Sequence, residues 1–268
     1  MRWREGQSLR VAVVARSVYP LHRYGGLEQH VYDLVRSLLA RDVHITLIAP
    51  PAAADRPIDA RADAVFRHTN LTLSAVPYVT FPFANRKGTT ILDRSTAYPL
   101  FGWRAGRAAA RLAAAGKVDV VHGLGASVLG YVVTDNDPAR RAPLVFNPQG
   151  LEEFGATDPS RAPMKRLGYW PLRMAVRRCA HAADRVIATD RALVDPVIRH
   201  LHVDAGVVRV IPNAIELSEC DRPDSADRAQ ALRARIGAGA DDPLIVSVGR
   251  LEANKGFGVL LDALAGLD

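Results

Sequence analysis

The fold class of this chain is decided by one stretch near its end, Leu244-Ile245-Val246-Ser247-Val248-Gly249-Arg250-Leu251-Glu252-Ala253-Asn254-Lys255-Gly256. An apolar, β-branched run ends at Gly249, and apolar residues at helical spacing begin after Gly256. This order predicts a buried strand, a tight turn and a helix, the repeating unit of a parallel α/β sheet. Backbone N–H groups at such a helix start attract anions, and Arg250 and Lys255 lie in the turn. The stretch therefore predicts a site for a diphosphate.

The rest of the chain repeats this alternation of apolar runs and helical patterns. Strands are expected at residues 9–15, 44–49, 118–122, 144–147, 185–188 and 207–211. Helices are expected at 27–39, 103–115, 127–134, 164–183 and 193–201, with Pro171 kinking or splitting the fourth. The segment 52–97 is read only as short β-rich pieces, at 66–73 and 76–81. The pattern predicts a doubly wound, Rossmann-like parallel sheet of the α/β class.

A domain boundary is expected after Asn213, where a polar stretch begins. This gives a Rossmann-like domain at 1–213, and a linker with the first βα unit of a second, truncated Rossmann-like domain at 214–268. A strand at 244–248 without neighbours would leave backbone groups unpaired. Residues 217–268 are therefore expected to be less ordered than the first 210 residues, or to pack on the first domain.

Composition and charge exclude several classes of protein. The net charge is +7, from 35 Lys and Arg against 28 Asp and Glu, which fits either solvated basic faces or a surface for an anionic partner. No nucleic-acid-binding motif is present, so no nucleic-acid partner is expected. Cys179 and Cys220 lack metal-type spacing and indicate reduced thiols. No signal peptide or membrane span is expected, which predicts a cytoplasmic protein, with peripheral attachment to the inner face of the membrane as an alternative.

The first βα turn holds the paired glycines Gly25 and Gly26, followed by Glu28 in the first helical turn. Paired glycines let a ligand approach the backbone closely, although an ordinary glycine turn has the same sequence. Glu28 could simply complement the helix dipole. The Gly-x-Gly-x-x-Gly fingerprint of dinucleotide-binding proteins is absent, which disfavours a nicotinamide-dependent dehydrogenase.

Three motifs in order along the chain resemble family 4 glycosyltransferases of the GT-B fold. They are residues 25–31 (GGLEQHV), 210–215 (VIPNAI) and 248–256 (VGRLEANKG), and residues 182–188 (AADRVIA) also fit. The resemblance implies two Rossmann-like domains face to face, with the acceptor on the first and a nucleotide-sugar donor on the second. It also implies retention of configuration, with no metal or other cofactor besides the donor substrate.

The resemblance implies roles for residues at both ends of the chain. Arg250 and Lys255 would hold the donor diphosphate and stabilise charge on the leaving group. Gly25 and Gly26 would let the backbone of the first domain approach the diphosphate or the transferred sugar, and Glu28 would border that pocket.

Residues at the interdomain linker and at two strand ends complete the candidate site. Asn213 has a turn role or contacts the ligand. His122, the candidate catalytic residue, is expected to end its strand and contact sugar or acceptor, with a packed histidine as an equal alternative. Gln149 stands where relatives often have histidine and can hydrogen-bond a sugar hydroxyl. For Glu152 and Glu153 a solvated loop is favoured over the border of the acceptor site.

The helix expected at 164–183 carries several arginines beside Leu167, Trp170 and Met174. A stripe of apolar residues facing the core, with a solvated basic face, is favoured over a lipid-facing surface.

Two functions of different classes remain open. The first is a hexosyl- or glycosyltransferase acting on a glycan, a lipid or a small molecule, inactive as the 268-residue chain alone because the Glu-x7-Glu motif of the family is expected beyond Asp268. The second is a non-catalytic module that binds a sugar or a partner.

Overall fold

The computed structural model describes residues 8–22, 25–52, 58, 60–80, 90–134, 141–155, 167–217, 223–239, 241–249, 251 and 255–266. The chain divides into two compact units, Met1–Ala214 and Ile215–Asp268. Each unit is described by itself.

The first unit is built on a seven-stranded parallel sheet with the order β3-β2-β1-β4-β5-β6-β7. Its strands are β1 (Arg10–Val14), β2 (His44–Ala49), β3 (Leu71–Ala75), β4 (Val120–Leu124), β5 (Leu144–Asn147), β6 (Arg185–Ala188) and β7 (Val208–Val210). The order reverses between β1 and β4, which is the arrangement of a doubly wound sheet.

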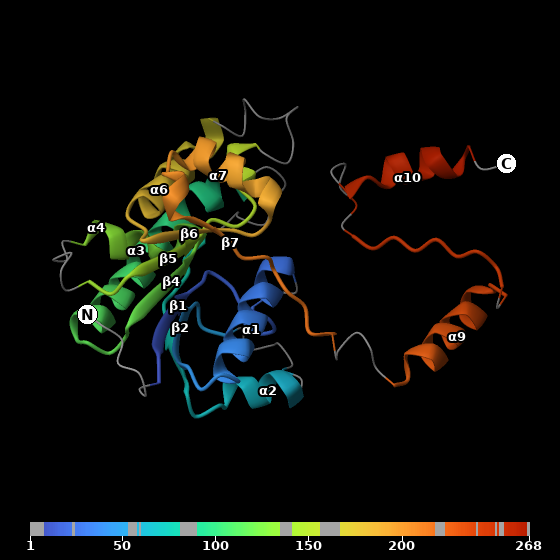
Figure 1. Ribbon diagram of the computed structural model, residues 1–268, viewed down its shortest axis with the longest axis horizontal. Coiled ribbons are helices and arrows are strands. Elements are labelled where there is room, and N and C mark those ends of the chain that lie inside the picture. Colours follow the sequence, from blue (N-terminus) through green and yellow to red (C-terminus); the bar gives the residue numbers. More distant parts are fainter. Residues whose placement is uncertain are drawn as a thin grey trace. The chain divides into compact units, whose positions relative to one another are not determined.

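Helices cover both faces of this sheet (Figure 1). They are α1 (Gly26–Leu39), α2 (Ala60–Phe66), α3 (Thr90–Ala114), α4 (Leu129–Val133), α6 (Trp170–His181) and α7 (Val194–Leu201). Short 3-10 turns lie at η1 (Gly125–Val128), η2 (Glu152–Phe154), η4 (Arg191–Leu193) and η5 (Ala205–Val207). The core between α1, α2 and the sheet is separate from the core that α3, α4, α6 and α7 form on the opposite face. The doubly wound, Rossmann-like α/β fold expected from the sequence is confirmed.

The expectation for the segment 52–97 is wrong. This segment contains α2, β3 and the start of α3 rather than β-rich pieces at 66–73 and 76–81, and residues 76–80 form no strand.

The helix expected at 164–183 is split beside Pro171, which was one of the two alternatives for this proline. Residues 167–168 are helical, Tyr169 lies in a turn, and Pro171 lies in the first turn of α6. The N–H that proline lacks has no intrahelical partner at that position.

Helices α3 and α4 approach each other closely because glycines line their contact. A Cβ added at Gly102 would lie 1.9 Å from the backbone oxygen of Ala126, and one at Gly130 would lie 1.9 Å from that of Trp103. The long helix α3 is thereby fixed against the turn that follows β4.

The second unit contains α9 (Ser225–Ile236) and α10 (Phe257–Leu264). The strand expected at 244–248 is not formed, and Val248 is 94% exposed. A parallel strand needs hydrogen-bonded neighbours, and the described part of this unit supplies none.

We expect the backbone amides of residues 244–248 to exchange with deuterium far faster than those of β1 and β4. Unpaired backbone groups open to water exchange without an unfolding step, whereas amides of central strands exchange only on large-scale opening. Hydrogen exchange followed by mass spectrometry measures both segments in one sample. Equal protection of residues 244–248 and of β4 would contradict this expectation.

Candidate active site

The candidate site lies where the strand order reverses, at the carboxyl ends of β1, β4 and β5. Ligands of open α/β sheets bind in the crevice at this point. The chain there supplies Arg16 and Ser17 after β1, Gly125 after β4 and the loop 148–151 after β5. Helix α1 begins beside the same edge.

The glycine turn before α1 is held by Glu28. This carboxylate is buried and accepts a hydrogen bond from the hydroxyl of Ser17, and it also folds back over Gly25. A Cβ on Gly25 would lie 2.5 Å from Oε2 of Glu28. Around Gly26 no atom lies within 4 Å of an added Cβ, and both glycines are exposed. Glu28 therefore shapes the turn, and Gly26 leaves open space beside the helix start.

His122 lies inside β4 and does not end it, contrary to expectation. It pairs in register with Val13, and the strand continues to Leu124. Its Nε2 is buried without a hydrogen-bond partner among the described residues. Burial and the neighbouring His30 lower the pKa of His122 to about 4. At neutral pH the ring is therefore an uncharged imidazole.

We expect the low pKa of His122 to make the first unit less stable in mild acid. Below pH 6.5 the unfolded chain binds a proton on this residue, and the folded chain does not until about pH 4. The free energy of unfolding should fall by about 2 kcal/mol from this residue between pH 7 and pH 5.

Urea unfolding at pH 7 and pH 5 measures this loss, and His122→Gln is the matched variant because its amide does not titrate. The loss between the two pH values should be smaller in His122→Gln by about this amount. The same loss in both proteins would show that His122 titrates normally.

A cavity of about 220 Å³ opens at the same edge of the sheet. Its lining residues come from the ends of β1, β4 and β5 and from α1, α3, η2 and α6: Arg16, Leu27, Arg94, Tyr98, Gly125, Pro148, Gln149, Gly150, Glu152, Glu153, Leu172 and Val176. The volume is below the range of about 300–1,000 Å³ typical of sites for drug-sized ligands. It suits a small polar molecule or one end of a larger one.

One wall of the cavity is formed by Arg16, Tyr98 and Gly125. The Arg16 guanidinium lies 5.1 Å from the ring centroid of Tyr98, and it makes no ion pair with the described residues. The Tyr98 hydroxyl donates a hydrogen bond to the backbone oxygen of Leu124 at 3.0 Å. A Cβ on Gly125, whose φ is +56°, would lie 2.4 Å from that hydroxyl. Only glycine fits there, on grounds of space and of backbone conformation.

Two acidic residues also line the cavity. The expectation of a solvated loop is wrong for Glu153, which is buried, while Glu152 is exposed to solvent. Glu153 is 6% exposed, and burial raises the pKa of its carboxyl. Glu152 pairs with Arg94 at 2.7 Å. Residues 152–154 form the turn η2, which packs on α6 and draws both carboxyl groups against the cavity.

The loop after β5 presents Gln149 to the cavity in an unusual conformation. Gln149 has φ +66° and Leu151 has φ +52°, both in the left-handed region. The backbone N–H of Gln149 donates to Oδ1 of Asn147 at 3.0 Å, which stabilises this turn. Side-chain Nε2 of Gln149 is buried without a hydrogen-bond partner among the described residues, and Nε of Arg94 is likewise buried without one. Buried donors without partners are rare and point to a ligand.

Sequence reasoning did not identify Arg16, Arg94 and Tyr98 as residues of this cavity. The place of Arg16 directly after β1 is a signal for a ligand-binding position. Arg94 and Tyr98 come from the part of α3 that was not recognised as a helix.

Of the residues expected to bind the donor, Lys255 lies in the second unit, in the turn directly before α10. A Cβ on Gly249 would lie 3.4 Å from the ring of Phe257 and 3.8 Å from Cγ of Lys255, so the turn brings these three residues together. Arg250 lies outside the described residues. Asn213 is exposed in the coil after β7. Binding by these residues stays a prediction.

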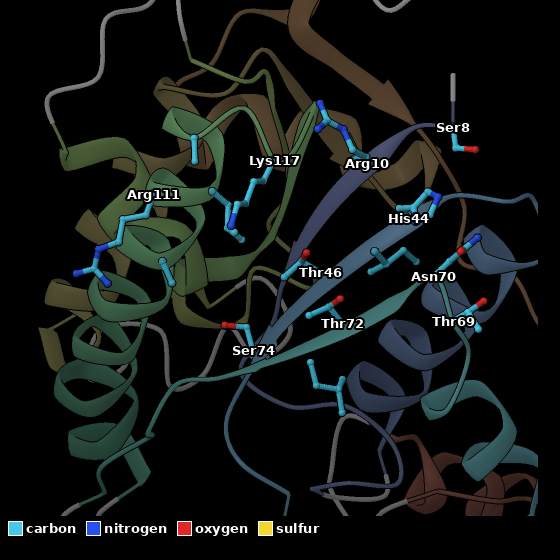
Figure 2. A pocket seen from close by; sticks show the side chains of 15 residues that line it. Ser8, Arg10, His44, Thr46, Thr69, Asn70, Thr72, Ser74, Arg111 and Lys117 are labelled. Atoms are coloured by element: carbon cyan, nitrogen blue, oxygen red, sulfur yellow. The ribbon is translucent and has the colours of Figure 1, made fainter. Parts of the chain in front are cut away.

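A larger hollow of about 1,320 Å³ lies beside the first half of β2 and the middle of β3 (Figure 2). Thr46, Thr72 and Ser74 project from the strands, and Arg111 and Lys117 come from the end of α3 and the turn after it. Its residues Ser8, His44 and Asn70 lie at the amino-terminal ends of the strands. Ligands of such sheets bind at the opposite, carboxyl-terminal ends. We therefore assign the site to the smaller cavity.

Among the described residues, no group of three His, Cys, Asp or Glu side chains is arranged to hold a metal ion. No helix in the described ranges is both long enough and apolar enough to cross a bilayer. Cys179 is a free, buried thiol in α6, and Cys220 lies outside the described residues.

Comparisons with known proteins agree with this geometry. Over 259 residues the chain is 27% identical to the alpha-maltose-1-phosphate synthase of Mycolicibacterium smegmatis, covering 95% of this chain and 57% of that protein. The chain thus spans little more than half the length of this curated relative.

Among solved structures, the catalytic domain of starch synthase IV from Arabidopsis thaliana, bound to ADP and acarbose, superposes with a TM-score of 0.61 at 15% identity. The match covers 97% of this chain and 66% of that one. Anabaena Alr3699/HepE in complex with UDP-glucose gives 0.56 at 17% identity, over 96% of this chain and 57% of that one. Both show the GT-B type of Rossmann-like fold. Residues 24–219 match the model of Glycosyltransferase Family 4, and the chain belongs to this family.

Proposed function

We propose that this chain forms the acceptor side of a retaining glycosyltransferase that moves a sugar from a nucleotide-diphosphate sugar to a hydroxyl-bearing acceptor. The observation that carries the proposal is the cavity at the strand ends, where Nε2 of Gln149 and Nε of Arg94 are buried and have no hydrogen-bond partner in the described structure. An acceptor with several oxygen atoms would satisfy both donors.

The cavity residues divide into groups with different tasks. Gln149 and Arg94 would bind acceptor oxygens. Arg16, which forms no ion pair with the described residues, is placed for an anionic group such as a phosphate. Glu153, whose carboxyl pKa is raised by burial, would form a hydrogen bond with an acceptor hydroxyl. The acceptor would be small and polar, or would be the end of a glycan or a lipid-linked sugar.

Residues of each unit would bind the donor, without a metal ion or other cofactor. Gly25 and Gly26 would let the diphosphate or the sugar approach the start of α1. Arg250 and Lys255 would neutralise the diphosphate as the nucleotide leaves. His122, uncharged at neutral pH, would act as a hydrogen-bonding group near the sugar and not as a cation.

Catalysis would need more of the donor-binding unit than residues 215–268 provide. The apolar run 244–248 forms no strand, and the chain covers 57% of its relative. A longer polypeptide or a complementing chain would supply the rest. Nucleotide sugars are made in the cytoplasm, which is where we propose that the reaction takes place.

The test combines acceptor binding with transfer. Saturation-transfer NMR on the chain would be run with glucose, glucose 1-phosphate and myo-inositol phosphate as probes, for the native protein and for Gln149→Ala, Arg16→Ala and the control Lys117→Ala. Transfer from UDP-glucose and ADP-glucose would be assayed with and without a complementing donor half, and NMR of the product gives its anomeric configuration.

We expect binding of a probe that the two cavity variants weaken about tenfold and that Lys117→Ala leaves unchanged. Transfer with retention should appear only when the donor half is present. Binding without transfer in every arrangement would favour the non-catalytic module. If Gln149→Ala and Arg16→Ala bind the probe with the affinity of the native protein, the assignment of the site is refuted.

A further inference from the structure

An apolar surface on the outer side of α3 and α6 has no role in the transferase site. Leu167 is 82% exposed, Trp170 61% and Met174 46%, so these side chains do not form the core-facing stripe expected from the sequence. The core side of α6 is made instead by Leu172, Ala175, Val176 and Cys179. Trp170 and Met174 are four residues apart in α6, which places them on one face, and Leu167 lies just before this helix.

Helix α3 adds further exposed apolar residues beside them. We call the outer apolar patch the following set: Leu92, Leu100, Trp103, Leu167, Trp170 and Met174. One hydrogen bond joins α3 to the residues just before α6. The hydroxyl of Ser95 in α3 donates to the backbone oxygen of Gly168 at 2.6 Å. Both helices cover the same face of the sheet, so their solvent faces point the same way (Figure 1).

The exposed charges carried by α3 and α6 themselves have one sign. Arg104, Arg107 and Arg111 are exposed on α3, and Arg178 is exposed on α6. The Arg107 guanidinium stacks on the ring of Trp103 at 4.8 Å. No acidic residue occurs in α6, and the one in α3, Asp93, is not exposed and accepts a hydrogen bond from Tyr78.

We propose that the outer apolar patch and its arginines bind the surface of a bilayer that contains anionic lipid. Tryptophan and long apolar side chains enter the headgroup boundary, while arginines keep their charge among lipid phosphates. The absence of acidic side chains from the exposed faces of α3 and α6 removes the repulsion that would oppose this contact.

The charges also argue against a second copy of this chain as the partner that binds the outer apolar patch. A twofold contact sets the same patch against itself, so it would bring the arginines of both copies together. An anionic bilayer is complementary to the patch in two ways. Its negative surface matches the arginines, and the apolar layer beneath matches the exposed apolar side chains.

The test is flotation of the protein with vesicles of phosphatidylcholine alone, or of phosphatidylcholine with phosphatidylglycerol. The double variant Leu167→Ala/Trp170→Ala removes apolar contact, and the triple variant Arg104→Gln/Arg107→Gln/Arg178→Gln removes charge. The matched controls are Leu73→Ala, an exposed leucine on β3, and Arg191→Gln, an exposed arginine in η4. Circular dichroism verifies that each variant is folded, as expected for exposed positions.

Native protein should float with the anionic vesicles and not with neutral ones, and its tryptophan emission should shift to shorter wavelength. The triple variant should lose about 10²-fold in partition coefficient, and the double variant at least about tenfold, while both controls stay native. Equal flotation on both vesicle types, native binding by the double variant, or dimer formation through the patch in place of flotation would each overturn the proposal.

Discussion

Replacing Gly130 by alanine should unfold much of the first unit at room temperature, or lower its melting temperature by more than ten degrees. The new Cβ would lie 1.9 Å from the oxygen of Trp103, 2.7 Å from its carbonyl carbon and 2.8 Å from the nitrogen of Arg107. All three are backbone atoms in the middle of α3, so no flexible side chain can move aside. The helices must separate, at a cost of about 3 kcal/mol or more.

Gly26→Ala is the matched control for this substitution. No atom lies within 4 Å of the Cβ it would add, and the residue begins α1. Its free energy of unfolding should stay within about 1 kcal/mol of the native value. Thermal unfolding followed by circular dichroism compares the two variants. A melting temperature of Gly130→Ala within a few degrees of the native one would mean that α3 and α4 are not in this close contact.

The same contact links stability to the candidate site. Arg94 and Tyr98 project from the first half of α3, and the Tyr98 hydroxyl holds the backbone oxygen of Leu124 at the end of β4. Separation of α3 from the turn after β4 would therefore widen the cavity. Gly130→Ala should lose acceptor binding even in the fraction that remains folded.

The sheet could be predicted from sequence wherever a strand is buried on both faces. Residues 44–49, 144–147 and 185–188 were expected as strands with the bounds that the structure gives. Such runs are continuously apolar because helices cover both sides. The edge strand β3 was predicted poorly, since the polar residues Thr72 and Ser74 interrupt that pattern.

The first half of α3 could not be predicted because glycine and proline interrupt its pattern. Gly102 is buried there beside the aromatic residues Tyr98 and Phe101, and Pro99 lies inside the helix. Glycine and proline indicate a break in a helix when only the sequence is read. Their presence is explained by the close approach of α4, which depends on the tertiary structure.

Some residues of the candidate site could be predicted from the sequence, and others could not. Gln149 was identified from the family resemblance, and the turn at Gly25 from its paired glycines before a helical pattern. Arg94 reaches the cavity from a helix that no local pattern revealed. Glu153 looked like a loop residue, and only the packing of η2 on α6 shows that it is buried.

Lys255→Ala should lower turnover by about 10²-fold in a form of the protein that transfers sugar. The lysine is exposed directly before α10, and no described acidic residue forms an ion pair with it. Helix α10 begins at Phe257 after its N-cap Gly256, whose φ of +71° turns the chain, and no side chain of the described residues caps its first N–H groups. Free N–H groups and an adjacent cation together favour a diphosphate whose charge grows as the nucleotide leaves.

Arg250→Ala should have an effect of similar size, and Lys255→Arg should recover part of the rate because it keeps the charge. The matched control is Lys117→Ala, a lysine of the hollow at the other end of the sheet. The kcat measured at saturating donor separates lost stabilisation of the leaving group from weaker donor binding, which appears in KM. Native kcat in Lys255→Ala would remove the donor assignment and leave the acceptor cavity standing, because the two sets of residues belong to different units of the chain.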